Sequence, residues 1–371
     1  MFNQKQETKV INESKLNEFA EKVMGDLAAT LSSVMVNVGD RLGLYEALAN
    51  ADKPLDSQEL SQITDTAERC IREWLANQAA GGYIIYDKES KKYSFPQEHV
   101  MILANINSPL YLLGGFQAAS SYFKDVEKIC SAFKTGKGLA WGDHDIDLFE
   151  GTERFFEPNY RANITTSWIP SLENGKVEEN LKKGALVADV GCGHGISTII
   201  MAKAYPNSKF VGFDNHGPSI DRARMLAQKE GLGEERITFK IHSAKDYPLL
   251  YPNSQYDLVT IYDALHDMDD PVGAAQHALG SLKENGTIML VEPSANDKLE
   301  NNLTPLGRAM FAGSACACVL NSMANNGLAL GAQAGQAKIS EVMKKAGFKR
   351  FRLATQTLVN MVYEAKPSQE Q

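Results

Sequence analysis

The chain has 371 residues, of which 43% are hydrophobic and 23% charged, which excludes wholesale disorder and suggests about two domains. Its formal net charge of −8 argues against a general polyanion-binding protein. Five scattered cysteines without CxxC spacing predict a reducing, cytoplasmic location and no metal site. We also expect no membrane segment, because the amino terminus lacks an apolar signal core and the longest uncharged stretch, 309–337, is rich in Asn and Gln.

The first hundred residues are predicted to form a helical, winged-helix domain. After a polar lead over 1–15, apolar residues recur at helical spacing through 16–48. Residues 54–99 then follow the order helix, helix, β-hairpin. Residues 51–100 carry nine acidic and six basic side chains, too few cations for phosphate binding. Nucleic acid is therefore an unfavoured partner, and we predict that residues 1–102 form a dimerisation module.

A helical connector is expected over 103–183, and strands and helices alternate from residue 184 onward. This alternation predicts an α/β fold with a Rossmann-like, seven-stranded, doubly wound sheet ending in an antiparallel hairpin. The expected strands are 186–190, 210–213, 237–241, 258–262, 287–291, 351–355 and 358–365.

A glycine-rich turn follows the first expected strand of this domain. Asp189 ends an apolar run, and Gly191, Gly193 and Gly195 come next. Glycines suit a turn in which a ligand approaches the main chain closely. A dinucleotide fingerprint would place its third glycine at position 196, where this chain has Ile196. The spacing therefore favours a nucleoside ligand without a pyrophosphate.

Polar residues also follow the next strands. Asp214 and Asn215 follow the second strand, and a carboxylate there can accept hydrogen bonds from ribose hydroxyls. Ser243 and Ala244 follow the third strand, and Asp263 follows the fourth. Open α/β sheets bind ligands at these carboxyl ends, so we expect all of these residues to border one site.

Together, the D-V-G-C-G-H-G motif at 189–195, Asp214, the Ser243-Ala244 loop, the Y-D-L-V strand at 256–259 and Gly286 resemble the class I S-adenosylmethionine-dependent methyltransferases. The resemblance covers about 184–371. It implies S-adenosyl-L-methionine as cofactor, with His194 contributing through its backbone. Ser243 departs from the acid that many members use for adenine, which leaves more of that contact to the backbone of Ala244.

The whole chain, including segments such as F-E-G-T-E-R-F-F at 149–156, resembles winged-helix small-molecule O-methyltransferases and a bacterial branch with unassigned substrates. That resemblance implies a homodimer and places Tyr160 beside the cofactor or substrate. His266 matches the histidine of a His-Asp pair that includes the base in the plant-type enzymes, and Asp267 is then a candidate to orient it. The alternative is that His266 packs against the cofactor, with His144 a second candidate base.

We therefore predict a methyltransferase that moves a methyl group to a small-molecule acceptor, with oxygen the favoured atom. The uncharged segment 310–335 is expected to cover the active site. Two alternatives stay open: a winged-helix regulator whose methyltransferase-like domain senses a ligand, and an NAD-linked oxidoreductase.

Overall fold

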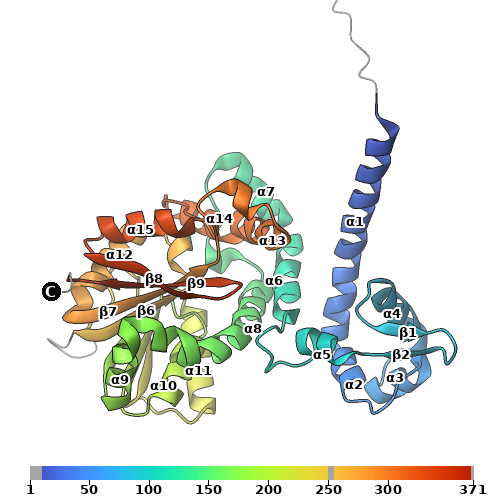
Figure 1. Cartoon of the computed structure of the whole chain (residues 1–371), viewed down its shortest axis with the longest axis horizontal. Helices are drawn as coiled ribbons and strands as arrows, with labels where there is room; N and C mark the ends of the chain where they lie inside the picture. Colours follow the sequence, from blue (N-terminus) through green and yellow to red (C-terminus); the bar gives the residue numbers. More distant parts are fainter. Residues whose placement is uncertain (1–10, 250–254, 369–371) are drawn as a thin grey trace, which may run out of the picture. The chain divides into compact units, whose positions relative to one another are not determined.

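The structure, a computed structural model, describes residues 11–249 and 255–368. It divides into two compact units, Met1–Phe116 and Gln117–Gln371 (Figure 1). The division falls inside α6 (Leu113–Lys124), beyond the boundary at residue 102 that the sequence suggests. The expected connector is therefore shared between the two units, and most of it belongs to the second.

The first unit combines a group of helices with a short hairpin. The helices are α1 (Glu13–Arg41), α2 (Leu44–Ala49), α3 (Ser57–Thr64), α4 (Glu68–Ala80) and α5 (Gln97–Leu103), and the hairpin pairs β1 (Ile85–Asp87) with β2 (Lys92–Ser94). This is the helix, helix, hairpin order of the predicted winged helix.

Local sequence signals set several of these boundaries. The Asn12 side chain caps α1, so the helix begins inside the polar lead expected over 1–15. Gly43, at φ 65°, separates α1 from α2. Asp56 and Glu59 form a reciprocal capping box at the start of α3. These contacts satisfy amide groups that a helix start otherwise leaves without partners.

One face of α1 carries an exposed apolar stripe. Within this helix only Val36 and Gly39 are buried; a Cβ on Gly39 would lie 2.6 Å from the Trp74 ring. The stripe, which we call the α1 stripe, consists of exposed apolar side chains at helical spacing: Leu16, Phe19, Val23, Leu27, Leu31 and Val34.

The second unit is a three-layer α/β domain. Its sheet has the order β5-β4-β3-β6-β7-β9-β8. The strands are β3 (Leu186–Val190), β4 (Lys209–Asp214), β5 (Ile237–Ile241), β6 (Tyr256–Tyr262), β7 (Leu282–Pro293), β8 (Arg350–Gln356) and β9 (Asn360–Lys366). The strands β3 to β7 pair in parallel, and β9 pairs antiparallel with β7 and β8. The predicted seven-stranded sheet with its terminal hairpin is confirmed.

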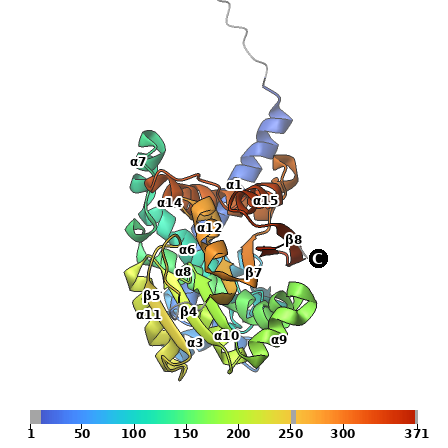
Figure 2. The same cartoon turned by 90° about the vertical axis from the view of Figure 1, so that its left-hand side faces the viewer.

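Helices cover both faces of this sheet, with α9, α10 and α11 on one face and α12 and α15 on the other (Figure 2). The α-helices after the division are α7 (Val126–Thr135), α8 (Ile146–Asn163), α9 (Lys176–Lys183), α10 (Ile196–Ala204), α11 (Gly217–Lys229), α12 (Pro271–Ser281), α13 (Pro305–Gly313), α14 (Val319–Ala324) and α15 (Gly335–Lys345).

Alternation along the strands divides the apolar side chains between two cores. In β3, Val187 joins the core beneath α9, α10 and α11, whereas Ala188 and Val190 join the core beneath α12 and α15. Both faces of the parallel strands are therefore apolar, as expected for a doubly wound sheet. The polar side chains at the carboxyl ends of these strands belong to neither core, and several of them line a cavity.

No helix among residues 11–249 and 255–368 combines the length and apolarity that a bilayer span requires.

Candidate cofactor and active site

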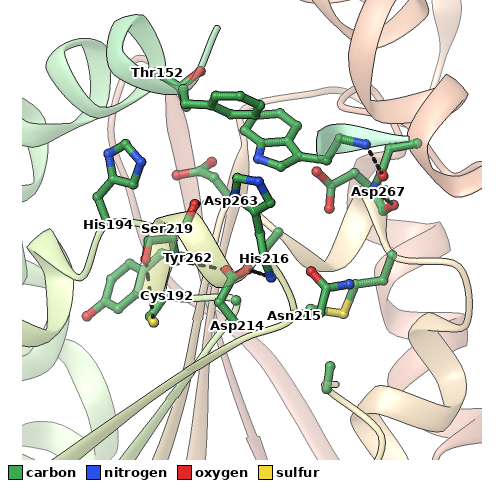
Figure 3. Close-up of a pocket in the computed structure, with 18 of the residues that line it drawn as sticks. Thr152, Cys192, His194, Asp214, Asn215, His216, Ser219, Tyr262, Asp263 and Asp267 are labelled. Carbon is green, nitrogen blue, oxygen red and sulfur yellow. Dashed lines mark hydrogen bonds between the residues drawn. The ribbon is translucent and has the colours of Figure 1, made fainter. Parts of the chain in front are cut away.

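A cavity of about 580 Å³ lies where β3, β4, β5 and β6 end (Figure 3). Its lining includes most of the site residues that the sequence predicts: Tyr160, Gly191, Gly193, His194, Asp214, Asn215, Ser243, Ala244 and Asp263. Four predicted residues are not in the lining: His144, Asp189, Gly195 and His266. The sheet therefore brings the expected strand ends together at one cavity.

The three glycines of the turn have different surroundings: two are packed closely against neighbouring side chains, and one faces open space. Gly191, Gly193 and Gly195 all have positive φ, at 72°, 52° and 77°. A Cβ on Gly191 would lie 2.9 Å from that of Ala264, and one on Gly195 would lie 2.6 Å from the Phe239 ring. A Cβ on Gly193 would meet no heavy atom within 4 Å among the described residues. The backbone at Gly193 is thus open to the cavity, whereas Gly195 belongs to the packed base of the turn.

Asp189 supports this turn from below and does not reach the cavity. Its carboxylate accepts hydrogen bonds from the hydroxyls of Ser197 and Thr198, each at 2.6 Å, and from Thr260 at 2.9 Å. Burial raises its pKa, which those three hydroxyls partly offset. Asp189, predicted from its motif as a cofactor-site residue, therefore lies outside the cavity lining and fixes the start of α10.

Asp214 ends β4 beside the turn, and its two oxygens bind backbone amides. Oδ2 accepts from the N–H of Gly193 at 2.9 Å, and Oδ1 accepts from the N–H of His216 at 2.8 Å. Burial raises the pKa of Asp214, whereas these amides and the neighbouring imidazoles lower it. An oriented carboxylate in this position can accept further hydrogen bonds from vicinal hydroxyls.

Asp263 follows β6 and belongs to a buried polar network. Its carboxylate accepts from the Tyr160 hydroxyl at 2.7 Å and from the Asn360 amide at 2.8 Å. Its backbone has φ 47°, a strained value for a residue other than glycine. Burial raises the pKa of Asp263 to about 7. Strain and a displaced pKa at a cavity wall are typical of functional positions.

His266 lies behind the cavity wall and is held by a carboxylate. Only 4% of the residue is exposed, and its Nδ1 lies 2.6 Å from Oε2 of Glu292, at the carboxyl end of β7. Burial favours the neutral ring, but the Glu292 carboxylate and the Cys318 side chain together outweigh that effect and hold the pKa of His266 well above its ordinary value.

The residue that orients His266 is therefore Glu292 and not the adjacent Asp267. The Asp267 carboxylate instead borders the cavity. Burial raises its pKa to about 7. Adjacent residues in this short turn point their side chains apart, which explains the difference from the expectation.

His144 does not reach the cavity, although Trp141 and Gly142 of the same loop line it. His144 is 6% exposed, and its Nδ1 lies 3.2 Å from Oδ2 of Asp125. Burial lowers its pKa, against the attraction of Asp125. The structure places His144 in the packing beneath the loop.

The uncharged segment reaches the cavity through α14. Asn321 lines the cavity; its Oδ1 accepts from the N–H of Trp141 at 2.9 Å, and its Nδ2 donates to the carbonyl of Asp267 at 3.0 Å. One side chain thus joins the loop before α8 to the end of β6.

Comparisons with known proteins agree with this geometry. Residues 181–347 match the family model "Methyltransferase domain", and residues 29–105 match the "Rv2258c-like winged HTH domain". The chain therefore carries a methyltransferase domain after a winged helix-turn-helix domain.

Among curated relatives of this methyltransferase domain, 27-O-demethylrifamycin SV methyltransferase of Amycolatopsis mediterranei is 31% identical over 151 residues, 40% of this chain and 48% of that protein. The ubiquinone biosynthesis O-methyltransferase of Proteus mirabilis is 26% identical over 163 residues, 42% of this chain and 62% of that protein. The match covers about half the length of such relatives.

Solved structures extend the likeness to the whole fold. A putative O-methyltransferase from Nostoc punctiforme has a TM-score of 0.67 at 20% identity, over 93% of this chain and 98% of that one. Human N-acetylserotonin methyltransferase, solved with S-adenosylmethionine, has a TM-score of 0.66 at 18% identity, over 100% of both chains. Because the sequence identities are only 20% and 18%, these two comparisons show a shared fold and nothing about substrate.

Several residues at the methyltransferase site escaped sequence reasoning. Glu292 gave a usable signal, because it is an acid at the carboxyl end of a predicted apolar strand. His216, which no sequence motif singled out, lines the cavity with its ring centroid 5.1 Å from that of Phe149. Glu153 reaches the glycine turn from α8. Such contacts between distant segments leave no local pattern in the sequence.

Proposed function

We propose that this protein is an S-adenosylmethionine-dependent methyltransferase acting on a small-molecule acceptor, with oxygen as the favoured acceptor atom. The observation that carries the proposal is the open backbone at Gly193 beside the oriented Asp214 carboxylate, in one cavity at the sheet edge. The matched methyltransferase domain and the O-methyltransferase relatives support it.

The residues present fit the cofactor. We assign Asp214 to the ribose hydroxyls, because its carboxylate is fixed by two amides and borders the cavity. The loop at Ser243 and Ala244 then borders the adenine, and Asp263 with Tyr160 borders the amino-acid arm. Gly193 fits because a side chain there would occupy the space that the nucleoside needs.

When bound, the cofactor supplies a methyl group that its sulfonium already activates. The protein then has to orient the acceptor and exclude water. Trp141, Phe149 and Asn321 line the same cavity, and Asn321 accepts a hydrogen bond from the N–H of Trp141. His266 lies behind the wall of this cavity, so we assign it to remove the proton of an acceptor that reaches this wall, with Glu292 fixing the ring and stabilising its charge after the transfer.

The binding step is tested by calorimetry with S-adenosylmethionine and NAD on the full chain. We expect S-adenosylmethionine to bind and NAD not to bind. Asp214→Ala should weaken cofactor binding by about 1.5–3 kcal/mol, because charge-assisted hydrogen bonds are lost. Binding of NAD alone would favour the oxidoreductase, and unchanged affinity in Asp214→Ala would remove this residue from the ribose site.

Turnover is tested by incubating the protein with radiolabelled cofactor and a metabolite extract. Transfer of label to a small molecule, stable to acid, is the expected result. Tight cofactor binding without transfer to any extract would favour the ligand-sensing regulator instead. Identifying the labelled product by mass spectrometry then defines the acceptor atom.

We further propose that the protein is a cytoplasmic homodimer in which the α1 stripe packs against a second copy. Apolar side chains repeated along one helix face need a covering surface in water, and here they stay exposed over the described residues. All five cysteines are free, which supports a reducing compartment.

The dimer is tested by light scattering on the purified chain. We expect twice the chain mass of 40.7 kDa, and Leu27→Glu should shift the protein toward the monomer. Ala29→Glu is the matched control, because it adds the same charge about 200° away around the helix. A monomeric wild type would contradict this assembly and leave the enzymatic proposal intact.

A further inference from the structure

A partly buried histidine–carboxylate pair lies in the cavity wall beside the glycine turn. His194 follows Gly193 in that turn, and its Nδ1 lies 2.5 Å from Oε2 of Glu153 on α8. The two side chains are 13% and 10% exposed, and both residues line the cavity. The catalytic roles assigned above use neither side chain.

Glu153 is itself fixed from a third element. Its other oxygen, Oε1, lies 3.7 Å from the guanidinium of Arg222 on α11. The carboxylate is therefore positioned between a cation in solvent contact and the imidazole in the cavity. Such a second partner limits the orientations of the imidazole and prepares it to bind a ligand.

The strand order places this pair at one end of the cavity. The tips follow the order β5, β4, β3, β6, so a nucleoside with its base at Ser243 and its ribose at Asp214 continues toward β3 and β6. His194 belongs to the turn after β3, and Asp263 follows β6. The amino-acid arm of the cofactor, which carries a carboxylate and an ammonium group, would lie at this end.

We propose that His194, positioned by Glu153, binds the carboxylate of the cofactor's amino-acid arm. This inference rests on the proposed function. In a protonated imidazole both ring nitrogens donate, so one ring can join Glu153 to a ligand carboxylate by charge-assisted hydrogen bonds. Asp263 offers the opposite charge at the same end, which suits the ammonium group.

The test compares two ligands that differ only in this carboxylate, S-adenosylmethionine and its decarboxylated form. Calorimetry on the wild-type chain should show tighter binding of the carboxylated ligand by about 10-fold or more. His194→Ala should reduce that preference to within about 2-fold, by weakening the carboxylated ligand and leaving the decarboxylated one unchanged. His194→Gln, which keeps a donor, should retain part of the preference.

Two further variants separate recognition from a structural role. Glu153→Gln keeps an acceptor for Nδ1 but loses the charge, so it should lose part of the preference, less than His194→Ala does. Asp214→Ala should weaken both ligands together, because both carry the ribose. Thermal unfolding of each variant verifies that it is folded.

Equal affinity of the wild type for both ligands, or an unchanged preference in both His194 variants, would overturn this inference and leave the proposed function standing. Binding of neither ligand to the wild type would overturn both. If His194→Ala and His194→Gln both weaken the binding of the two ligands equally, the His194–Glu153 pair has a structural role in packing α8 against the turn. That result would also overturn the inference.

Discussion

Two buried histidine–carboxylate pairs in the second unit have the same chemistry and opposite electrostatics. His266 with Glu292, and His144 with Asp125, each join a ring Nδ1 to a carboxylate, at 2.6 and 3.2 Å. Glu292, with a contribution from Cys318, holds the pKa of His266 well above its ordinary value despite burial, whereas burial lowers the pKa of His144. Residue type alone therefore does not decide which histidine can carry a proton.

The difference lies in what else binds each carboxylate. Asp125 also pairs with Lys128 at 2.8 Å and accepts from the N–H of Asp145 at 2.8 Å. The Lys128 charge additionally opposes a proton on His144. In Glu292, Oε1 has no hydrogen-bond partner among the described residues. A carboxylate that no other cation shares stabilises the imidazolium more strongly than a shared one does.

The largest expected effect is on turnover. His266→Ala should lower the rate of methyl transfer by roughly 100-fold or more, because the acceptor loses its general base. Glu292→Gln should lower it less, since the ring stays in place without its charged partner. Single-turnover rates with the acceptor found in the extract measure both.

His144→Ala is the matched control for this experiment, and its rate should stay within a few-fold of the wild type. Cofactor affinity should remain close to wild type in all three variants. Full turnover in His266→Ala would reduce His266 to a packing residue, and a collapse in His144→Ala alone would exchange the roles of the two pairs.

A smaller effect is expected on the pH dependence of the rate. A base must be neutral to accept a proton, so the raised pKa of His266 predicts a rate that increases as the pH rises through that value. Removing the Glu292 charge lowers this pKa, and the increase should move to lower pH in Glu292→Gln. Rates of the wild type and of Glu292→Gln, measured from pH 6 to 9, give the shift. If the two pH–rate profiles coincide, Glu292 does not control the pKa of the group that limits the rate.

The features of the fold that could be predicted are those encoded by residues adjacent in the sequence. The alternation of strands and helices, the glycine turn and the acid that ends β4 each arise from a few adjacent residues, and the structure confirms the predicted sheet. The order of strands then brings Asp214, Ser243 and Asp263 to one cavity, as the rule for open α/β sheets predicts.

Prediction from the sequence was weaker where the outcome depends on packing between distant segments. Asp189 and His266 belong to recognisable motifs, yet they lie behind the cavity wall. Glu292 stands 26 residues from His266 in the chain, and nothing in the local sequence joins them. The exposed α1 stripe also shows that helical periodicity identifies an apolar face without saying what covers it.

The smallest expected effect is on stability. His144 has a lowered pKa in the folded state, so the unfolded chain binds its proton more readily below about pH 6.5. Its contribution to stability is therefore complete above that pH and is lost as the pH falls toward the folded pKa, by at most about 1.4 kcal/mol per pH unit. His144→Gln removes this titration and should flatten the pH dependence of the free energy of unfolding between pH 5 and 7.

His266→Gln should change that dependence in the opposite sense. Because the folded pKa of His266 is raised, its contribution is complete below the unfolded value and is lost as the pH rises through the folded value. Relative to the wild type, the variant should thus be least stable at acid pH and recover above neutrality. Urea unfolding at several pH values measures how the free energy of unfolding of each variant depends on pH. An equal pH dependence in the two variants would show that the pKa values of His144 and His266 are not shifted in opposite directions.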